Sequence, residues 1–211
     1  PFEVSVLADP SGAYTTAAAL VACVEKELKE KHGKELKDCK ALVFGGTGPV
    51  GIATGVISSL AGATTSLVDH MSIDAANDVA KEYNRRCLST LIGAVASSDE
   101  DKISLIADVD VIFCTAKAGI QVLSSEVLAQ AKQLKVAGDV NAVPPAGIAG
   151  IKANADGVEL EEPKGAIGVG ALAVGNVKYQ VQNKLLQFAL DTDKPVYLDF
   201  REAFEQAREI V

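Results

Sequence analysis

The chain has 211 residues, 48% of them hydrophobic, and it carries a formal net charge of −8. A chain of this size buries roughly 70% of the surface that its unfolded form exposes, which is enough for a substantial core. The acidic balance, the scattered basic residues and the lack of any apolar run near the roughly 18 residues of a membrane span argue against nucleic-acid and membrane partners.

The predicted elements alternate between short apolar strands and amphipathic helices. The first strand is expected at residues 2–8 and the first helix at 15–31, where Thr15 or Thr16 can cap the start. The next elements are a strand at 41–45, a helix at 49–62, a strand at 64–69, a helix at 72–87, a strand at 90–95, a helix at 97–108, a strand at 110–116, a helix at 124–134 and a strand at 135–141. Apolar strands, each followed by a helix, indicate an α/β fold with a parallel sheet covered on both faces.

The pattern changes after residue 141. Residues 142–157 are rich in Gly, Ala and Pro and predict a long loop. Residues 165–190 begin as a strand or turn of small residues and become a helix near Gly175. Residues 196–211 predict a closing helix with Asp199 at its start.

A glycine-rich turn joins the strand at 41–45 to the helix that follows. The dinucleotide-binding motif G-x-G-x-x-G is matched by Gly46, Thr47, Gly48, Pro49, Val50 and Gly51. We assign the tight turn to Gly46, the close approach of a pyrophosphate to Gly48, and helix–strand packing to Gly51. Free N–H groups at the helix start favour phosphates. The alternative is a structural turn with nothing bound, but the context predicts a Rossmann-type doubly wound sheet.

Asp69 closes the strand at 64–69, near the roughly 20-residue spacing at which this motif places an acidic residue. Its carboxylate can accept hydrogen bonds from the ribose hydroxyls of the adenosine half, although it can instead cap the next helix. A 2′-phosphate there would meet a like charge, which His70 can partly offset. We therefore expect NAD as the preferred cofactor and NADP as a second one.

A catalytic base is hard to find in this sequence. His32 lies in a charged surface stretch, and His70 lies at the adenosine end of the predicted site. No Tyr-x-x-x-Lys motif occurs, and Tyr83 and Tyr179 are expected to pack on helices. The sequence therefore favours a hydride transfer that needs no strong base, or a domain without chemistry of its own.

Four segments resemble the NAD(P)-dependent methylene-tetrahydromethanopterin dehydrogenases of methylotrophic bacteria, in the form dedicated to methanopterin. They are ADPSGAYTTAAA, VFGGTGPVG, DVNAVPPAGIAGI and GVGALAVGNVKYQ, in collinear order. The resemblance implies removal of a hydride from the methylene bridge of a C1-carrying pterin, in formaldehyde oxidation. The two nitrogens beside the bridge stabilise the methenyl cation, so no proton need be abstracted.

The resemblance also implies site residues. The nicotinamide half would be lined by Asn141 and by the segment CTAKAG, which includes Thr115, Ala116 and Lys117. Lys178 matches a family lysine near the reaction centre, where it would position substrate or tune charge; a solvated helix lysine is the alternative. The pterin cleft would be bordered by Asp9, Ser11 and Thr15, which could also form an ordinary strand-to-helix turn.

The family pattern implies that further residues precede Pro1, so we expect an N-terminally incomplete chain with part of a second, pterin-binding domain. The expected divisions are 1–35, a strand and helix that border the substrate cleft; 36–175, the NAD(P)-binding Rossmann domain; and 176–211, C-terminal helices that pack back on the substrate side.

Two other functions stay open at this point. One is an NAD-binding Rossmann domain without turnover, acting as a sensor or structural unit. The other is a different dehydrogenase such as a shikimate-type enzyme, which is disfavoured because the Lys/Asp pair expected of it is not visible. The four separated cysteines, without a C-x-x-C pair, predict reduced thiols in the cytoplasm and no metal site. A homo-oligomer is expected.

Overall fold

The computed structural model describes residues 3–211, so Pro1 and Phe2 of the predicted first strand lie outside the described residues. Seven strands pair in one sheet: β2 (Lys40–Phe44), β3 (Thr64–Asp69), β4 (Ile92–Val95), β5 (Val111–Cys114), β6 (Val136–Asp139), β7 (Val158–Glu159) and β8 (Ile167–Val169). Their order is β4-β3-β2-β5-β6-β8-β7, and every pairing is parallel except that of β7 with β8. Without β7 this is the Rossmann order, which confirms the predicted fold class.

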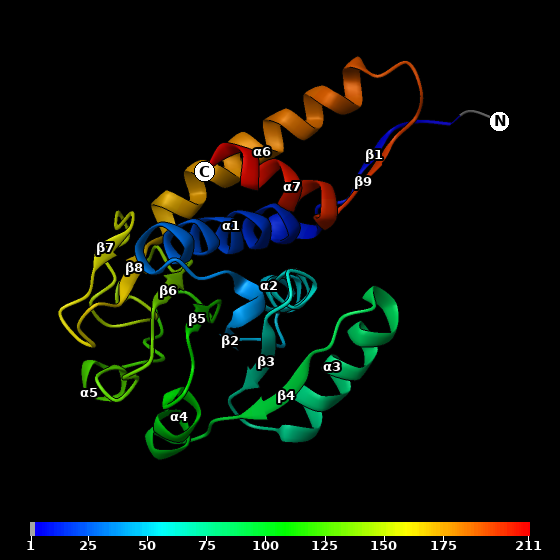
Figure 1. Ribbon diagram of the computed structural model, residues 1–211. Coiled ribbons are helices and arrows are strands. Elements are labelled where there is room, and N and C mark those ends of the chain that lie inside the picture. Colours follow the sequence, from blue (N-terminus) through cyan, green and yellow to red (C-terminus); the bar gives the residue numbers. More distant parts are fainter. Residues whose placement is uncertain (1–2) are drawn as a thin grey trace.

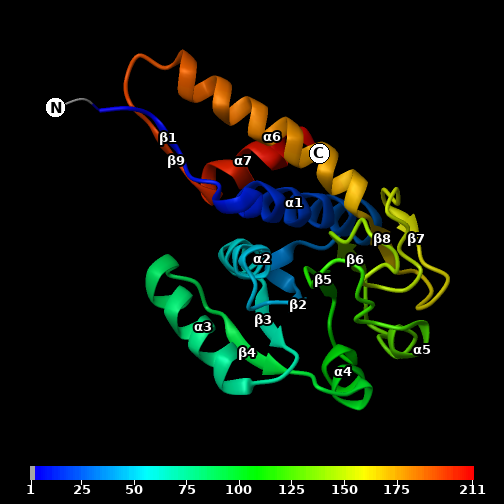
Figure 2. The same cartoon turned by 180° about the vertical axis from the view of Figure 1, so that it is seen from behind.

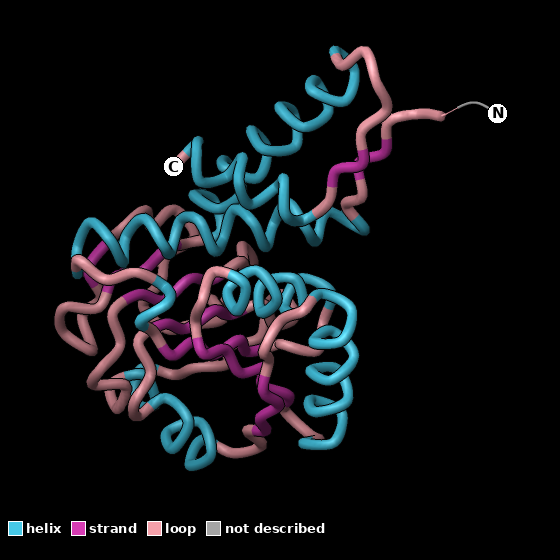
Figure 3. The backbone as a smooth tube through the Cα atoms, turned by 45° about the vertical axis from the view of Figure 1, so that its right-hand side comes forward, coloured by secondary structure: helices cyan, strands magenta, loops and turns pink. Residues whose placement is uncertain are grey.

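Helices cover both faces of this sheet (Figures 1 and 3). The α-helices of the described residues are α1 (Ala13–His32), α2 (Pro49–Leu60), α3 (Ile73–Cys87), α4 (Asp99–Ile106), α5 (Ser125–Leu128), α6 (Ala171–Asp191) and α7 (Phe200–Ile210). Of these, α6 and α7 pack mainly on α1 and on each other. Alternate strand residues face opposite sides. Ala41 and Val43 of β2 join a core with α1, α2, α6 and α7, whereas Leu42 and Phe44 join a second core with α4 and α5.

The start of α1 differs from the prediction. The helix begins at Ala13 with Gly12 at its N-cap, so the expected cap by Thr15 or Thr16 is wrong. A short 3₁₀ turn, η1 (Pro10–Gly12), precedes it. The carboxylate of Asp9 reaches past η1 and accepts hydrogen bonds from the amide N–H groups of Tyr14 at 2.9 Å and Thr15 at 3.1 Å. Because Asp9 satisfies these donors, no threonine is needed as a cap.

The predicted first strand is short and lies outside the main sheet. β1 (Val6–Leu7) pairs in parallel with β9 (Tyr197–Leu198), so the segment 196–211 begins as a strand before it becomes α7. Figures 1 and 2 show this two-stranded ribbon beyond the helical layer of α1, α6 and α7. Asp199 is the N-cap of α7 and forms a capping box with Glu202, which confirms the predicted helix start.

Two other helices differ clearly from the prediction. The expected helix at 124–134 is only the four-residue α5, because the chain turns back after Leu128 so that Ala131 and Leu134 can bury their side chains on the way to β6. α6 begins at Ala171, ahead of the expected start near Gly175. Gly170 follows β8 and is the N-cap of α6; it lies against the carbonyl oxygen of Lys152, where a side chain would overlap the backbone.

Candidate active site

The turn between β2 and α2 is built on glycines that pack against neighbouring backbone. The left-handed residue is Gly45, with φ +72°, so the assignment of the tight turn to Gly46 is wrong. Gly46 instead lies against β3, where a Cβ would be 2.8 Å from the Cα of Leu67. A Cβ on Gly51 would overlap the carbonyl oxygen of Gly45, so Gly51 has the close-packing role that was predicted.

Gly48 differs from the other glycines of this turn because a side chain would have space there. In the described part of the chain, the one atom within 4 Å of a Cβ built on Gly48 is the carbonyl oxygen of Gly45, at 3.4 Å. Gly48 is the N-cap of α2, Pro49 occupies the first turn, and no described side chain caps this helix end. The first amide groups of α2 are therefore available to an anion, and the helix dipole favours one there.

Thr115 ties the end of β5 to the glycine turn. Its hydroxyl donates to the carbonyl oxygens of Phe44 at 2.9 Å and Gly45 at 3.3 Å. β2 lies between β3 and β5 in the sheet, so the strand order reverses beside it. Sheets of this kind bind ligands in the crevice at that reversal, at the carboxyl ends of the strands. Thr115 therefore fixes the two strand ends that border this crevice.

Asp69 is held in a fixed orientation at the end of β3. Its Oδ1 accepts from the amide groups of Met71 at 2.8 Å and Ser72 at 2.9 Å, and its Oδ2 accepts from the hydroxyl of Thr47 at 2.8 Å. Burial alone would raise the pKa of Asp69, but these hydrogen bonds outweigh it and hold the pKa below its ordinary value. The carboxylate is ionised, and it both caps the following turn and borders the crevice.

A pocket of about 410 Å³ runs along these strand ends. The predicted cofactor residues that line it are Thr47, Gly48, Asp69, His70, Thr115, Ala116 and Lys117. Those outside its lining are Gly46, Pro49, Val50, Gly51 and Asn141. Ser97 and Lys102, which were not among the predicted site residues, also line the pocket, from the segment after β4 and from α4. Neither lies near the glycine motif in sequence, so only the strand order could have indicated them.

Asn141 orders a loop beside the pocket. Its side chain is buried; the Oδ1 accepts from the amide groups of Gly119 at 3.2 Å and Val143 at 2.9 Å, and the Nδ2 donates to the carbonyl oxygen of Pro145 at 2.8 Å. The side-chain amide of Asn141 therefore forms its hydrogen bonds with groups of the protein itself. Asn141 thus connects the loop after β5 to the segment that follows β6.

Asp139, which the sequence analysis missed, lies beneath that segment at the end of β6. It is 1% exposed, and its carboxylate accepts from the amide groups of Asn141 at 2.9 Å and Ile148 at 3.0 Å. Burial raises its pKa, and burial also raises the pKa of the neighbouring Cys114 thiol to about 12. Asp139 holds the loop at 141–148 against the end of β6, and Gly147 of this loop lies against both Cys114 and Asp139. The close contact leaves no room for a larger side chain at that position.

Gly147 is the tightest point of this loop, and Gly147→Ala should destabilise the protein by about 1–3 kcal/mol through overpacking. A Cβ there would lie 2.5 Å from the Sγ of Cys114 and 2.9 Å from the Oδ1 of Asp139. Urea unfolding would measure the loss. The double variant with Cys114→Ala should recover part of it because the sulfur is removed. Equal losses in the single and double variants would contradict this explanation.

The predicted substrate residues and Lys178 gather at the start of α1. Ser11, with φ 54°, and Gly12, with φ 70°, are two successive left-handed residues, and Ser11 is exposed. The Nζ of Lys178 on α6 lies 3.1 Å from where a Cβ on Gly12 would stand. Thr15 is fully buried, and its hydroxyl donates to Asp9 at 2.7 Å. Ser11 is thus exposed and Lys178 is half-buried, whereas Thr15 supports Asp9.

The start of α1 and the glycine turn border one cavity. A pocket of about 280 Å³ is lined by Pro10 and Ala13 on one side and by Thr47 and Pro49 on the other. The segments that contain the predicted substrate residues and the predicted phosphate-binding turn are therefore neighbours in space, although about 35 residues of helix and strand separate them in the chain.

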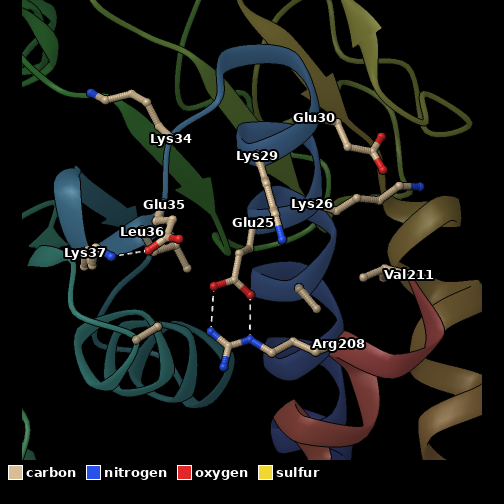
Figure 4. A pocket seen from close by; sticks show the side chains of 12 residues that line it. Glu25, Lys26, Lys29, Glu30, Lys34, Glu35, Leu36, Lys37, Arg208 and Val211 are labelled. Atoms are coloured by element: carbon tan, nitrogen blue, oxygen red, sulfur yellow. Dashed lines mark hydrogen bonds and ion pairs between the residues drawn. The ribbon is translucent and has the colours of Figure 1, made fainter.

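Another pocket, of about 520 Å³, lies elsewhere (Figure 4). It is bordered by the second half of α1, by η2 (Leu36–Asp38), and by Ala61 at the far end of α2. Two ion pairs lie in its lining: Arg208 donates to both oxygens of Glu25 at 2.6 Å, and Lys37 pairs with Glu35. It lies at the opposite end of α2 from Gly48 and is not part of the candidate site.

Metal and membrane features are not found in residues 3–211. No group of three or more His, Cys, Asp or Glu side chains within that range could hold a metal ion. Within the same range, none of the helices combines the length and apolar character needed to cross a bilayer. His32 is partly buried, and its Nε2 lies 3.1 Å from the carbonyl oxygen of Lys135, away from the candidate site.

Two curated proteins of Methylorubrum extorquens are similar to the whole chain. One, an NAD(P)-dependent methylenetetrahydromethanopterin dehydrogenase, is 44% identical over 211 residues. The other, the bifunctional protein MdtA, is 30% identical over 210 residues, and the chain spans 70% of the length of each. No protein-family model matches.

Among solved structures, the transhydrogenase of Sinorhizobium meliloti superposes with a TM-score of 0.58. The match covers 93% of this chain and 59% of that one, at 18% identity, and so concerns the fold alone.

Proposed function

Because this chain belongs to the family of NAD(P)-dependent methylenetetrahydromethanopterin dehydrogenases, we propose that it transfers a hydride from methylene-tetrahydromethanopterin to NAD(P). The product is the methenyl form, and the reaction belongs to C1 oxidation of formaldehyde. The observation that carries the proposal is the pairing of an uncapped helix start at Gly48 with the oriented carboxylate of Asp69 in one pocket. Bound NAD(P) supplies the hydride acceptor.

The residues of the chain have distinct roles in this proposal. The amide groups at the start of α2 bind the pyrophosphate, and Asp69 accepts from the ribose hydroxyls. Thr115 and Asn141 hold the strand end and loop beside the nicotinamide half. Thr115, Ala116 and Lys117 face that half, and His70 lies at the adenosine end.

Lys178 and Ser11 position the pterin across the glycine turn. The ammonium of Lys178 lies over Gly12, next to the exposed Ser11, and these groups can hold polar parts of the substrate. Lys178 does not stabilise the developing methenyl cation, since both carry positive charge. Catalysis then depends on placing the bridge carbon correctly, which is a matter of proximity and orientation. The helices α1, α6 and α7 form the side of the molecule that faces the pterin.

We also propose a cytoplasmic, homo-oligomeric protein. All four cysteines are free thiols, as expected of a reducing compartment. Phe188, Leu190 and Tyr197 are exposed on the distal part of α6 and on β9, and such apolar side chains favour a protein partner.

A hydride-transfer assay tests the proposed function. The protein is mixed with methylene-tetrahydromethanopterin and NAD or NADP, and the reduced nicotinamide is followed by its absorbance. Formation of reduced nucleotide that depends on both substrates supports the proposal. Nucleotide binding without turnover would instead favour an NAD-binding domain with a sensing or structural role.

Asp69→Ser should raise the ratio of NADP to NAD affinity by about tenfold, because it removes a negative charge that opposes a 2′-phosphate and an acceptor that favours the ribose hydroxyls. Calorimetric titration with each nucleotide would measure the two dissociation constants. Asp74→Ser, an exposed substitution in the first turn of α3, is the matched control and should leave the ratio unchanged. An unchanged ratio in Asp69→Ser would mean that Asp69 does not face the ribose.

A further inference from the structure

We propose that Lys102 of α4 binds a 2′-phosphate on the adenosine ribose, so that this chain accepts NADP despite the carboxylate of Asp69. The inference rests on the proposed dinucleotide site and names a residue that determines specificity within it.

The sheet brings Lys102 to the adenosine end. β4 lies beside β3, Asp69 pairs with Val95, and the amide of Ala96 donates to the carbonyl oxygen of Asp69 at 2.9 Å. The segment that leaves β4 therefore runs next to Asp69 before α4 begins. Lys102 lines the same pocket as Asp69, His70 and Ser97, and its side chain is 21% exposed.

Two lysines line the pocket, Lys102 and Lys117; Lys117 follows β5, whereas Lys102 belongs to the helix that follows β4, the strand beside Asp69. Both oxygens of Asp69 already accept hydrogen bonds from the protein, so a phosphate placed beside it meets a fixed negative charge. The turn after β3, from His70 to Asp74, contains no lysine or arginine. The cation therefore has to come from another element, and α4 supplies one.

The ion pair of Lys102 with Asp99 would compete only weakly with a phosphate for the ammonium group. Its Nζ donates to the Oδ1 of Asp99 at 2.8 Å, and the Asp99 side chain is 60% exposed and lies within one turn of the same helix. Exposed pairs of this kind contribute little to stability. An ammonium group has three donors, so Lys102 can contact a phosphate while it keeps or releases Asp99.

Direct binding of NAD and NADP to the full chain tests the inference. Lys102→Gln should weaken NADP binding about tenfold and change NAD binding less than about twofold, because only NADP carries the 2′-phosphate. Lys102→Arg should retain NADP binding. Asp99→Asn should strengthen NADP binding, because it frees the ammonium; the capping box of Ser98 and Asp101 that starts α4 is untouched.

Lys81→Gln is the matched control. Lys81 and Asp78 form a comparable pair three residues apart on α3, at 4.0 Å, and do not line the pocket. This variant should bind both nucleotides as the parent does.

The outcomes separate the inference from the proposed function. Equal weakening of NAD and NADP by Lys102→Gln would place Lys102 at a group that both nucleotides share and would overturn the inference. Unchanged NADP binding would overturn it as well. If the parent chain binds neither nucleotide, the proposed function fails, and the inference fails with it.

Discussion

Gly48→Ala is expected to lower the affinity for NAD and NADP by about 100-fold while the melting temperature stays the same. The added methyl group fits the protein, since its nearest neighbour would be the carbonyl oxygen of Gly45 at 3.4 Å. Gly48 also has φ −81° and ψ 165°, an extended conformation that any residue adopts. The methyl group would, however, occupy the space through which a pyrophosphate reaches the first amide groups of α2. Loss of charge-assisted hydrogen bonds worth about 3 kcal/mol corresponds to about 100-fold in affinity.

Calorimetric titration and thermal unfolding on the same samples would measure both effects. Gly175→Ala is a suitable control, because no described atom lies within 4 Å of its Cβ position and the residue sits inside α6. That variant should be more stable by about 0.5–1 kcal/mol and should bind nucleotide normally. Normal NAD affinity in Gly48→Ala would refute the assignment of this turn to the pyrophosphate.

Lys178→Ala is expected to reduce kcat by about 100-fold without changing the dissociation constant for NAD. Its ammonium lies over Gly12 at the start of α1, on the side of the glycine turn where we place the pterin. Loss of a positioning contact misplaces the bridge carbon, and a misplacement of about 1 Å can cost about 100-fold in rate. Steady-state kinetics with both substrates, together with nucleotide titration, would separate the two constants.

Lys184→Ala is the control for this prediction, because Lys184 is exposed on the same helix. It should leave kcat unchanged. Lys178→Arg should retain part of the rate, since a cation remains at the site. A Lys178→Ala variant with parental kcat and KM would remove Lys178 from the reaction and leave it as a surface lysine.

The Rossmann core could be predicted from the sequence because its signals are local. β5 is apolar throughout and β2 is apolar over 41–44, and β3 has the predicted bounds of 64–69. The turn at Gly45 to Gly51 and the acid at Asp69 lie a fixed spacing apart on consecutive elements. The packing role of Gly51 could likewise be read from the motif, and the structure confirms it.

The remaining features depend on contacts between distant segments. The capping of α1 by Asp9 requires η1 to fold back, and the short β1 pairs with β9 near the other end of the chain and packs against α6. Lys102 reaches the pocket because β4 is the neighbour of β3, a fact of strand order. The sequence shows only an acidic residue at the end of a strand; the role of Asp139 depends on the loop at 141–148, whose amide groups donate to its carboxylate. Local patterns carry no information about these tertiary contacts.

The β1–β9 ribbon has a consequence for the geometry at the start of α1. The amide of Val6 donates to the carbonyl oxygen of Val196, and that of Ala8 donates to the carbonyl oxygen of Leu198, both at 2.8 Å. One strand leads directly into Asp9 and the other into Asp199, so a single register fixes where both helices begin. A slip of one residue in either strand would reverse the facing of that strand and move the capping carboxylate that follows it out of position. The pairing of β1 with β9 thus positions the N-terminal ends of both α1 and α7.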